Sequence, residues 1–225
     1  MTEHLVLFDS PDQDVAGKHL LLMLHGFGSH ERDLLPLHQY LPADMIYASM
    51  RAPQPVGASL ALESLSAYIP GAAQGFQWYP LDRELKTEVR AVELATDYII
   101  DWLEEKATAA SSITLLGFSQ GAAMATSVAR RRPDLIKAVI NLSGFVVEEA
   151  SDYFADSAFK ATNMPVFYGR DTRDPVIPAE KVSFTCHWLR ENADVQEELY
   201  AGIFHGINLE ELKDVKTFLE EKVLS

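Results

Sequence analysis

The chain has 225 residues, 48% of them hydrophobic, which is enough to bury one full core, and we expect a single domain over residues 1–225. Its 19 basic and 33 acidic residues give a formal net charge of −14, which argues against nucleic acid and anionic lipid surfaces as partners. The longest apolar run is too short for a membrane span, the N-terminus lacks the features of a signal peptide, and the single Cys186 excludes an internal disulfide, so we expect a cytoplasmic protein.

The first predicted elements are an outer strand over residues 4–9 and a buried strand over residues 19–24. The second is a continuous apolar run, as is typical of a parallel strand buried on both faces. The loop His25-Gly-Phe27-Gly-Ser29 follows directly. A glycine-rich loop at the end of an inner strand lets the backbone N–H of Phe27 face a site, and we expect His25 to brace this loop. Residues 34–41 predict a short helix after it.

A long insertion follows the strand predicted over residues 45–50. Residues 53–81 are punctuated by glycine and proline and hold many apolar and aromatic side chains, which is uncommon in a compact domain unless the segment is functional. We therefore expect an apolar wall of a substrate pocket here, formed by Phe76, Trp78 and Tyr79. An ordered loop that covers part of the core is the alternative.

Two further elements lead to the centre of the chain. Apolar residues at spacings of three and four predict a long amphipathic helix over residues 83–106. A buried strand starting at Ile113 then ends in Gly117-Phe-Ser119-Gln-Gly121, which a helix rich in small residues follows as far as Arg132.

The segment around Ser119 matches the G-x-S-x-G nucleophile elbow in its strand–turn–helix context. In such an elbow a strained turn exposes the serine hydroxyl, and the glycines allow strand and helix to approach closely. We therefore predict that Ser119 is a nucleophile. The N–H of Gln120 would bind an oxyanion together with the N–H of Phe27. A tight turn that happens to carry a serine is the alternative reading.

The C-terminal part supplies an acid and a base in the order that a Ser…Asp…His hydrolase requires. After a strand over residues 138–142, a strand over 164–169 leads into a loop that holds Asp171 and Asp174. Asp174 is favoured as the acid because Pro175 and the apolar residues after it fix its backbone. Asp171 is expected to stabilise the turn through its own hydrogen bonds, and it stays open as the alternative acid.

The candidate base is His205, in a loop between a strand over residues 195–201 and an amphipathic helix over residues 209–223. His187 also follows the candidate acids. It lies inside a helix predicted over residues 179–190, and we expect it to be a surface or packing residue.

The alternation of strands and helices predicts an α/β fold, with a mainly parallel central sheet and helices on both faces. Several segments together resemble the small carboxylesterase/phospholipase and acyl-protein thioesterase family of α/β-hydrolases, over nearly the whole chain: His25-Gly-Phe-Gly, Gly117-Phe-Ser-Gln-Gly121, Asp174-Pro-Val-Ile-Pro178 and Phe204-His205-Gly. The resemblance implies the α/β-hydrolase fold with no large separate lid domain, and a triad of Ser119, Asp174 and His205. Two departures are a longer acid loop between Gly169 and Asp174, and Tyr79-Pro80-Leu81 where the family usually has Phe-Asp.

The resemblance also implies hydrolysis of small-molecule esters, or of thioesters, through an acyl-enzyme. If residues 53–81 line the pocket, we expect the acyl groups to be small or medium in size. No cofactor and no metal are expected, because neither H-E-x-x-H nor paired cysteine ligands occur. A lactonase, a peptidase or an acyltransferase would use the same parts, and a non-catalytic binding protein of the same fold is the remaining alternative. Whether the protein forms a homodimer stays open at this point.

Overall fold

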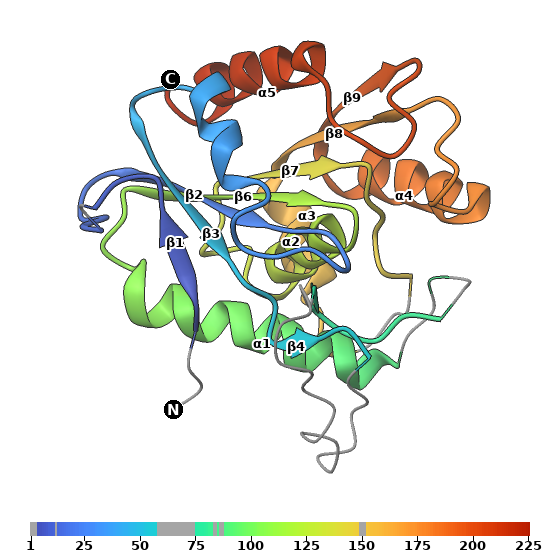
Figure 1. The fold of residues 1–225 in the computed structure, drawn as a ribbon, viewed down its shortest axis with the longest axis horizontal. Helices are drawn as coiled ribbons and strands as arrows, with labels where there is room; N and C mark the ends of the chain where they lie inside the picture. The colour runs from blue at the N-terminus through green and yellow to red at the C-terminus, as the bar shows by residue number, and fades with distance from the viewer. Residues whose placement is uncertain (1–3, 12, 58–74, 83–84, 86–87, 149–151) are drawn as a thin grey trace.

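The fold is built around a central seven-stranded sheet with the strand order β1-β3-β2-β6-β7-β8-β9 (Figure 1). The computed structural model describes residues 4–11, 13–57, 75–82, 85, 88–148 and 152–225. Strand β1 pairs antiparallel with β3, and every other neighbouring pair in this sheet is parallel. The bounds of these strands are β1 (Val6–Phe8), β2 (His19–Leu24), β3 (Met45–Met50), β6 (Ser112–Phe118), β7 (Ala138–Leu142), β8 (Pro165–Asp171) and β9 (Asp194–Tyr200).

Helices cover both faces of the sheet. In Figure 1, the short 3₁₀ helix η1 (Leu35–Tyr40) and α5 (Leu209–Lys222) lie above it, and α1 (Val89–Lys106) and α2 (Gln120–Arg131) lie below it. Helix α3 (Asp156–Thr162) packs with α2 on one side and with α4 (Ala179–Asn192) on the other. A two-stranded ribbon of β4 (Gln54–Pro55) and β5 (Phe76–Gln77) is separate from the sheet. The predicted mainly parallel sheet with helices on both faces is confirmed.

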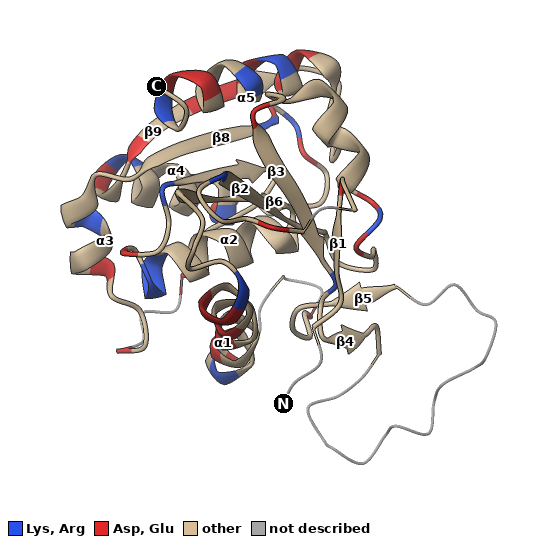
Figure 2. Cartoon of the chain, turned by 90° about the vertical axis from the view of Figure 1, so that its left-hand side faces the viewer, with Lys and Arg blue, Asp and Glu red and all other residues tan. Residues whose placement is uncertain are grey.

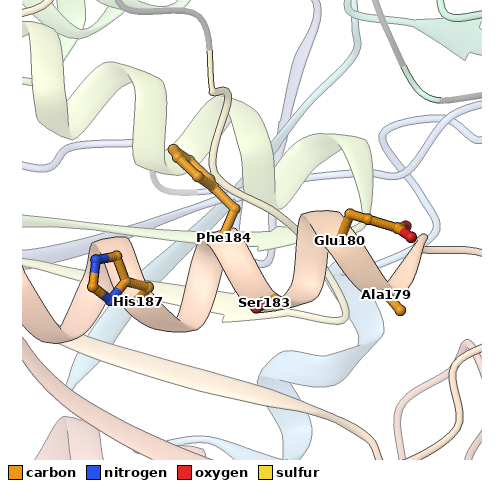
Figure 3. A pocket seen from close by; sticks show the side chains of 5 residues that line it. All are labelled: Ala179, Glu180, Ser183, Phe184 and His187. Atoms are coloured by element: carbon orange, nitrogen blue, oxygen red, sulfur yellow. The ribbon is translucent and has the colours of Figure 1, made fainter.

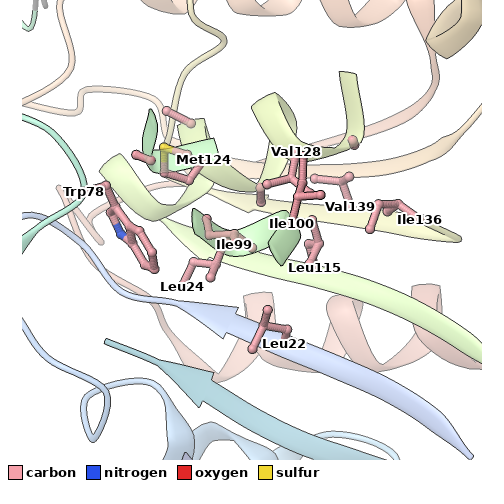
Figure 4. Close-up of a cluster of buried hydrophobic side chains, with 14 of the residues drawn as sticks. Leu22, Leu24, Trp78, Ile99, Ile100, Leu115, Met124, Val128, Ile136 and Val139 are labelled. Atoms are coloured by element: carbon pink, nitrogen blue, oxygen red, sulfur yellow. The ribbon is translucent and has the colours of Figure 1, made fainter. Parts of the chain in front are cut away.

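The alternation of side chains along β2 explains why a continuous apolar run forms this strand. Leu20, Leu22 and Leu24 belong to the hydrophobic cluster on the α1–α2 face, whereas Leu21 and Met23 belong to the cluster on the α5 face. All five side chains are fully buried. Figure 4 shows part of the first cluster, in which side chains of β2 lie with those of α1 and α2.

Three elements differ from the sequence prediction. Helix α1 begins at Val89 rather than near residue 83, and Leu85 has a φ of 57°, which lies outside the right-handed helical region. Strand β8 continues to Asp171, so this residue ends a strand instead of lying in the following loop. Helix α3 was not predicted, because it has only seven residues and buries one of them, Phe159.

Charged side chains lie mainly on the helices and at the sheet edge formed by β9, while the inner strands carry few (Figure 2). This distribution keeps ionic groups in water and leaves the strands free to pack on both faces. Within the described part of the chain, none of the helices is long and apolar enough to cross a membrane.

Candidate active site

Ser119 occupies the sharp turn between β6 and α2. Its φ of 54° and ψ of −116° lie in a region that non-glycine residues rarely adopt, at a cost of about 1–3 kcal/mol. A Cβ atom on Gly121 would overlap the main-chain carbonyl of Leu24, and one on Gly117 would overlap the carbonyl of Gly121. The two glycines therefore permit the close approach of β2, β6 and α2 that forms the elbow.

The imidazole of His205 joins Ser119 to Asp174. Its Nε2 lies 3.0 Å from Oγ of Ser119, and its Nδ1 lies 2.8 Å from Oδ2 of Asp174. A carboxylate only accepts hydrogen bonds, so Nδ1 carries the proton and donates a hydrogen bond to Asp174. In the neutral ring Nε2 then accepts from the serine hydroxyl. The ring of Phe118 packs beside the imidazole, 5.0 Å between centroids, and limits its motion.

The carboxylate of Asp174 is held at both oxygens. While Oδ2 accepts from His205, Oδ1 accepts from the backbone N–H groups of Val176 at 2.7 Å and of Ile177 at 3.1 Å. The side chain is only 3% exposed. These bonds orient the carboxylate toward the imidazole, in the position that the sequence favours for the triad acid.

Asp171 has a different set of partners. Its carboxylate accepts from the backbone N–H of Arg173 at 2.6 Å, which is the turn-stabilising bond expected from the sequence. It also accepts from the backbone N–H of Phe204 at 2.6 Å, and so ties the acid loop to the residue before His205. The N–H of Arg173, followed by that of Phe204, holds the pKa of this buried carboxyl below its usual range.

His25 braces the loop that carries Phe27. Its Nδ1–H donates to the carbonyl of Gly26 at 2.8 Å, and its Nε2 accepts from the backbone N–H of Ala52 at 3.0 Å. Burial lowers the pKa of this imidazole, so the ring is neutral and keeps one donor and one acceptor. His25 is fully buried, and it links the loop after β2 to the chain after β3.

Ser119 and His205 open onto a cavity of about 280 Å³. Phe27 and Gln120, whose N–H groups we predicted to bind an oxyanion, line the same cavity. Its described lining residues are mostly apolar: Phe27, Leu81, Asp82, Leu85, Ser119, Gln120, Phe145, Val176 and His205. The structure thus brings the turn between β6 and α2 together with the segments that follow β2, β5, β7, β8 and β9 around a single hollow.

The aromatic residues predicted to form the pocket wall lie elsewhere. Trp78 and Tyr79 are fully buried, and the ring of Phe76 lies under the guanidinium of Arg51 at 4.4 Å. None of these three is among the described residues that line the cavity at Ser119. The prediction assigned them to the pocket because apolar side chains in a proline- and glycine-rich segment look alike whether they face a ligand or the core. Residues 58–74 of the same insertion lie outside the described part of the chain.

A second hollow, of about 590 Å³, lies along α4 (Figure 3). Its described lining residues, Ala179, Glu180, Ser183, Phe184 and His187, all come from this one helix. The imidazole of His187 is exposed, and its Nε2 lies 3.4 Å from the carboxylate of Glu191 one turn away. It is a surface residue, as predicted. Over the described residues, no group of three or more His, Cys, Asp and Glu side chains is placed to hold a metal ion.

Sequence reasoning missed Glu211, a buried carboxyl in the first turn of α5. Asn208 caps this helix by accepting from the Glu211 N–H at 2.8 Å, and the N-x-x-E spacing was the available signal. Neither carboxyl oxygen of Glu211 has a hydrogen-bond partner of normal geometry among the described residues. Burial raises its pKa to about 8, against the opposing effect of the nearby Asn208 N–H. A Cβ atom on Gly169 would overlap this carboxyl, so the strand before the acid loop passes directly over it.

Comparison with known proteins places this arrangement among related chains. A model described as phospholipase/carboxylesterase matches residues 10–223. The chain is 24% identical to acyl-protein thioesterase 1 of Kluyveromyces lactis, over 91% of this chain and 92% of that relative. The crystal structure of esterase PE8 is 26% identical with a TM-score of 0.69, over 97% of this chain and 98% of that chain. The Bacillus cereus carboxylesterase, 19% identical over 99% of this chain and 95% of its own, has the same fold with a TM-score of 0.73.

Proposed function

This chain belongs to the phospholipase/carboxylesterase family and has the α/β-hydrolase fold, and from that premise we propose that it is a serine hydrolase of carboxylic esters or thioesters with small or medium acyl groups. The observation that carries the proposal is the continuous hydrogen-bonded chain from Ser119 through His205 to Asp174, of which Ser119 and His205 line one cavity. The family membership makes the protein a hydrolase of the esterase or thioesterase type, and the hydrogen-bonded chain supports the role proposed for each residue.

The first half of the reaction acylates Ser119. The Nε2 of His205 takes the hydroxyl proton while Oγ attacks the acyl carbonyl carbon, and the N–H groups of Phe27 and Gln120 bind the resulting oxyanion. Collapse of this intermediate breaks the bond to the leaving oxygen or sulfur. His205 returns its proton to the leaving alcohol or thiol. Asp174 keeps the imidazole in the productive tautomer and stabilises its charged form.

The second half removes the acyl group with water. His205 takes a proton from a water molecule that attacks the ester carbonyl, and the same N–H groups bind the second oxyanion. The bond to Ser119 Oγ then breaks, His205 returns the proton to Oγ, and a carboxylic acid leaves. Esters and thioesters differ only in the first leaving group. The relatives named for both substrate classes, an acyl-protein thioesterase and two esterases, support including both.

The size of the cavity supports a small or medium acyl group. Its volume of about 280 Å³ is just below the range that holds drug-sized ligands, roughly 300–1,000 Å³. Leu81, Leu85, Phe145 and Val176 give the hollow an apolar lining. Each acyl methylene buried against them is expected to favour binding by up to about 0.8 kcal/mol until the hollow is full.

Ser119→Ala tests the proposal, with Ser183→Ala as the control. Ser183 is an exposed serine of α4 that lines the second hollow. A fluorophosphonate probe should label the wild type and Ser183→Ala but not Ser119→Ala. Hydrolysis of p-nitrophenyl esters from acetate to octanoate, and of one thioester, should lose on the order of 10⁴–10⁶ in kcat in Ser119→Ala alone.

Two results would contradict this function. Ser119→Ala that keeps more than about a tenth of the wild-type kcat would remove Ser119 as the nucleophile, because loss of a triad nucleophile costs far more. A wild type that cleaves amides, or transfers the acyl group to an alcohol, in preference to hydrolysing esters would point to a peptidase or an acyltransferase with the same residues.

A further inference from the structure

The segment from Phe76 to Tyr79, which the sequence assigned to the pocket wall, is hydrogen-bonded both to the loop that carries Phe27 and to the side chain of Gln120. Trp78 and Tyr79 are fully buried in the cluster on the α1–α2 face of the sheet. Figure 4 shows the indole of Trp78 at the edge of this cluster, close to Met124 of α2 and Leu24 of β2. The segment therefore packs in the hydrophobic core, and it also contacts residues around the proposed active site.

The first set of contacts holds the loop of Phe27. The carbonyl of Phe76 accepts from the N–H of Gly28, and the N–H of Phe76 donates to the carbonyl of Ser29, both at 2.8 Å. On the other side of Phe27, the indole Nε1–H of Trp78 donates to the carbonyl of His25 at 2.8 Å. The segment thus binds the loop both before and after Phe27.

The second set of contacts holds Gln120. The backbone N–H of Trp78 donates to Oε1 of Gln120 at 3.1 Å, and Nε2 of Gln120 donates to the carbonyl of Tyr79 at 2.7 Å. Gln120 is 1% exposed, so its side-chain amide forms both of these hydrogen bonds, one as acceptor and one as donor, inside the protein. A glutamine meets this requirement because it carries a donor and an acceptor at one end, whereas a glutamate has no donor when ionised.

We propose that Trp78 is a positioning residue that sets the separation of the two backbone N–H donors on Phe27 and Gln120. This inference rests on the proposed function. Trp78 is joined to the two segments that carry these donors, through its indole to the carbonyl of His25 and through its backbone N–H to the side chain of Gln120. Donors that are held in place before the reaction stabilise an oxyanion without reorganising, and a displacement of about 1 Å costs up to 10²-fold in rate.

The test compares Trp78→Phe with the matched control Trp102→Phe. Trp102 is a buried tryptophan of α1 whose ring lies 6.4 Å from that of Phe8, so its replacement makes a similar cavity in the same cluster. Trp78→Phe should lower kcat on a p-nitrophenyl ester by about 10- to 100-fold with KM nearly unchanged. The affinity for a trifluoromethyl ketone, which forms an oxyanion on serine, should fall in parallel. Trp102→Phe should change the melting temperature similarly and leave both readouts near the wild type.

Gln120→Met approaches the same link from its other end. It removes both side-chain hydrogen bonds to the segment and keeps the backbone N–H of residue 120. We expect the same loss of kcat and of trifluoromethyl ketone affinity, and a double variant with Trp78→Phe should lose less than the product of the two single losses. If Trp78→Phe does not fold, Gln120→Met decides the question by itself.

The outcomes separate the two proposals. The positioning role is overturned, and the hydrolase function stands, if the wild type is active but Trp78→Phe behaves like Trp102→Phe. The same holds if the wild type is active and Gln120→Met keeps the wild-type affinity for the trifluoromethyl ketone. A wild type that neither hydrolyses esters nor reacts with a fluorophosphonate overturns both.

Discussion

The two sides of the proposed active site are held by different means. The acid–base side consists of residues 171–177 and 202–208, and two side-chain carboxylates hold it: Asp174 binds the His205 ring, and Asp171 binds the backbone at Phe204. The oxyanion side consists of residues 25–29, 76–79 and Gln120. There the contacts are hydrogen bonds of the buried, uncharged side chains of His25, Trp78 and Gln120, together with backbone hydrogen bonds of Phe76.

This difference predicts different sensitivities for the two sides. Changes of charge should act on the acid–base side, because side-chain carboxylates accept the hydrogen bonds that hold it. Volume and backbone changes should act on the oxyanion side, because its supports are neutral and close-packed. Substitutions that keep shape but alter charge are therefore expected to separate the two sides.

The largest effect is expected from Asp174→Asn on the acid–base side. The amide keeps the shape but favours the wrong tautomer of His205, and kcat for a p-nitrophenyl ester should fall by roughly 10⁴. The melting temperature should show that the protein is folded. If Asp171→Asn proved the more damaging of the two, the triad acid would be Asp171.

The next effect concerns stability beneath the acid–base side. The folded pKa of Glu211 is raised from 4.5 to about 8, so the native state keeps a proton that the unfolded chain has released. The free energy of unfolding should therefore fall as the pH rises from about 4.5 to 8, by up to about 5 kcal/mol from this group at about 1.4 kcal/mol per unit. The charge of Asp214 also raises the pKa of Glu211. The Tyr200 hydroxyl donates a hydrogen bond of 2.7 Å to the carboxylate of Asp214.

Urea unfolding at pH 5 and pH 8.5 measures this contribution. Glu211→Gln should lose less stability between the two pH values than the wild type does, whatever its absolute stability at pH 5. Glu210→Gln, on the exposed side of the same turn, is the control and should follow the wild type. Equal slopes for all three proteins would mean that Glu211 is not protonated in the native state.

A smaller effect is expected from Asp171→Asn. The amide accepts hydrogen bonds at only one of its two heavy atoms, so the N–H of Arg173 or that of Phe204 loses its acceptor. Because the second bond holds the residue beside His205, kcat should fall by up to about 10²-fold with little change in KM. Asp44→Asn, at an exposed aspartate before β3, is the control. A loss of melting temperature with kcat unchanged would confine Asp171 to its own turn.

The smallest effect is expected from Phe27→Ala on the oxyanion side. The substitution keeps the backbone N–H and removes a side chain that is 45% exposed, so kcat should stay within a few-fold of the wild type. KM for longer acyl esters should rise by roughly fivefold, from the loss of about 1 kcal/mol of apolar contact. A fall of kcat by 10² would show that the Phe27 ring itself sets the loop conformation.

The sequence by itself determined the strand order along the chain, the elbow at Ser119, and the succession of Asp174 and His205. These features can be predicted from the sequence because each depends on residues close together in the chain. An apolar run forms a strand buried on both faces, and two glycines flank the serine at a sharp backbone turn. The family resemblance drew on the same local segments, and the match over residues 10–223 bears it out.

Only the tertiary structure decided how the loops are held around the cavity. Trp78 meets His25 and Gln120 across 53 and 42 positions of sequence, and Asp171 meets Phe204 across 33. Residue type does not reveal which backbone N–H groups form hydrogen bonds between distant segments. Nor does it reveal whether an aromatic side chain in a loop faces a ligand or the core. Glu211 is the sharpest case, because a carboxyl in a helical first turn is ordinarily solvated, and its burial arises only where β8 passes over it at Gly169.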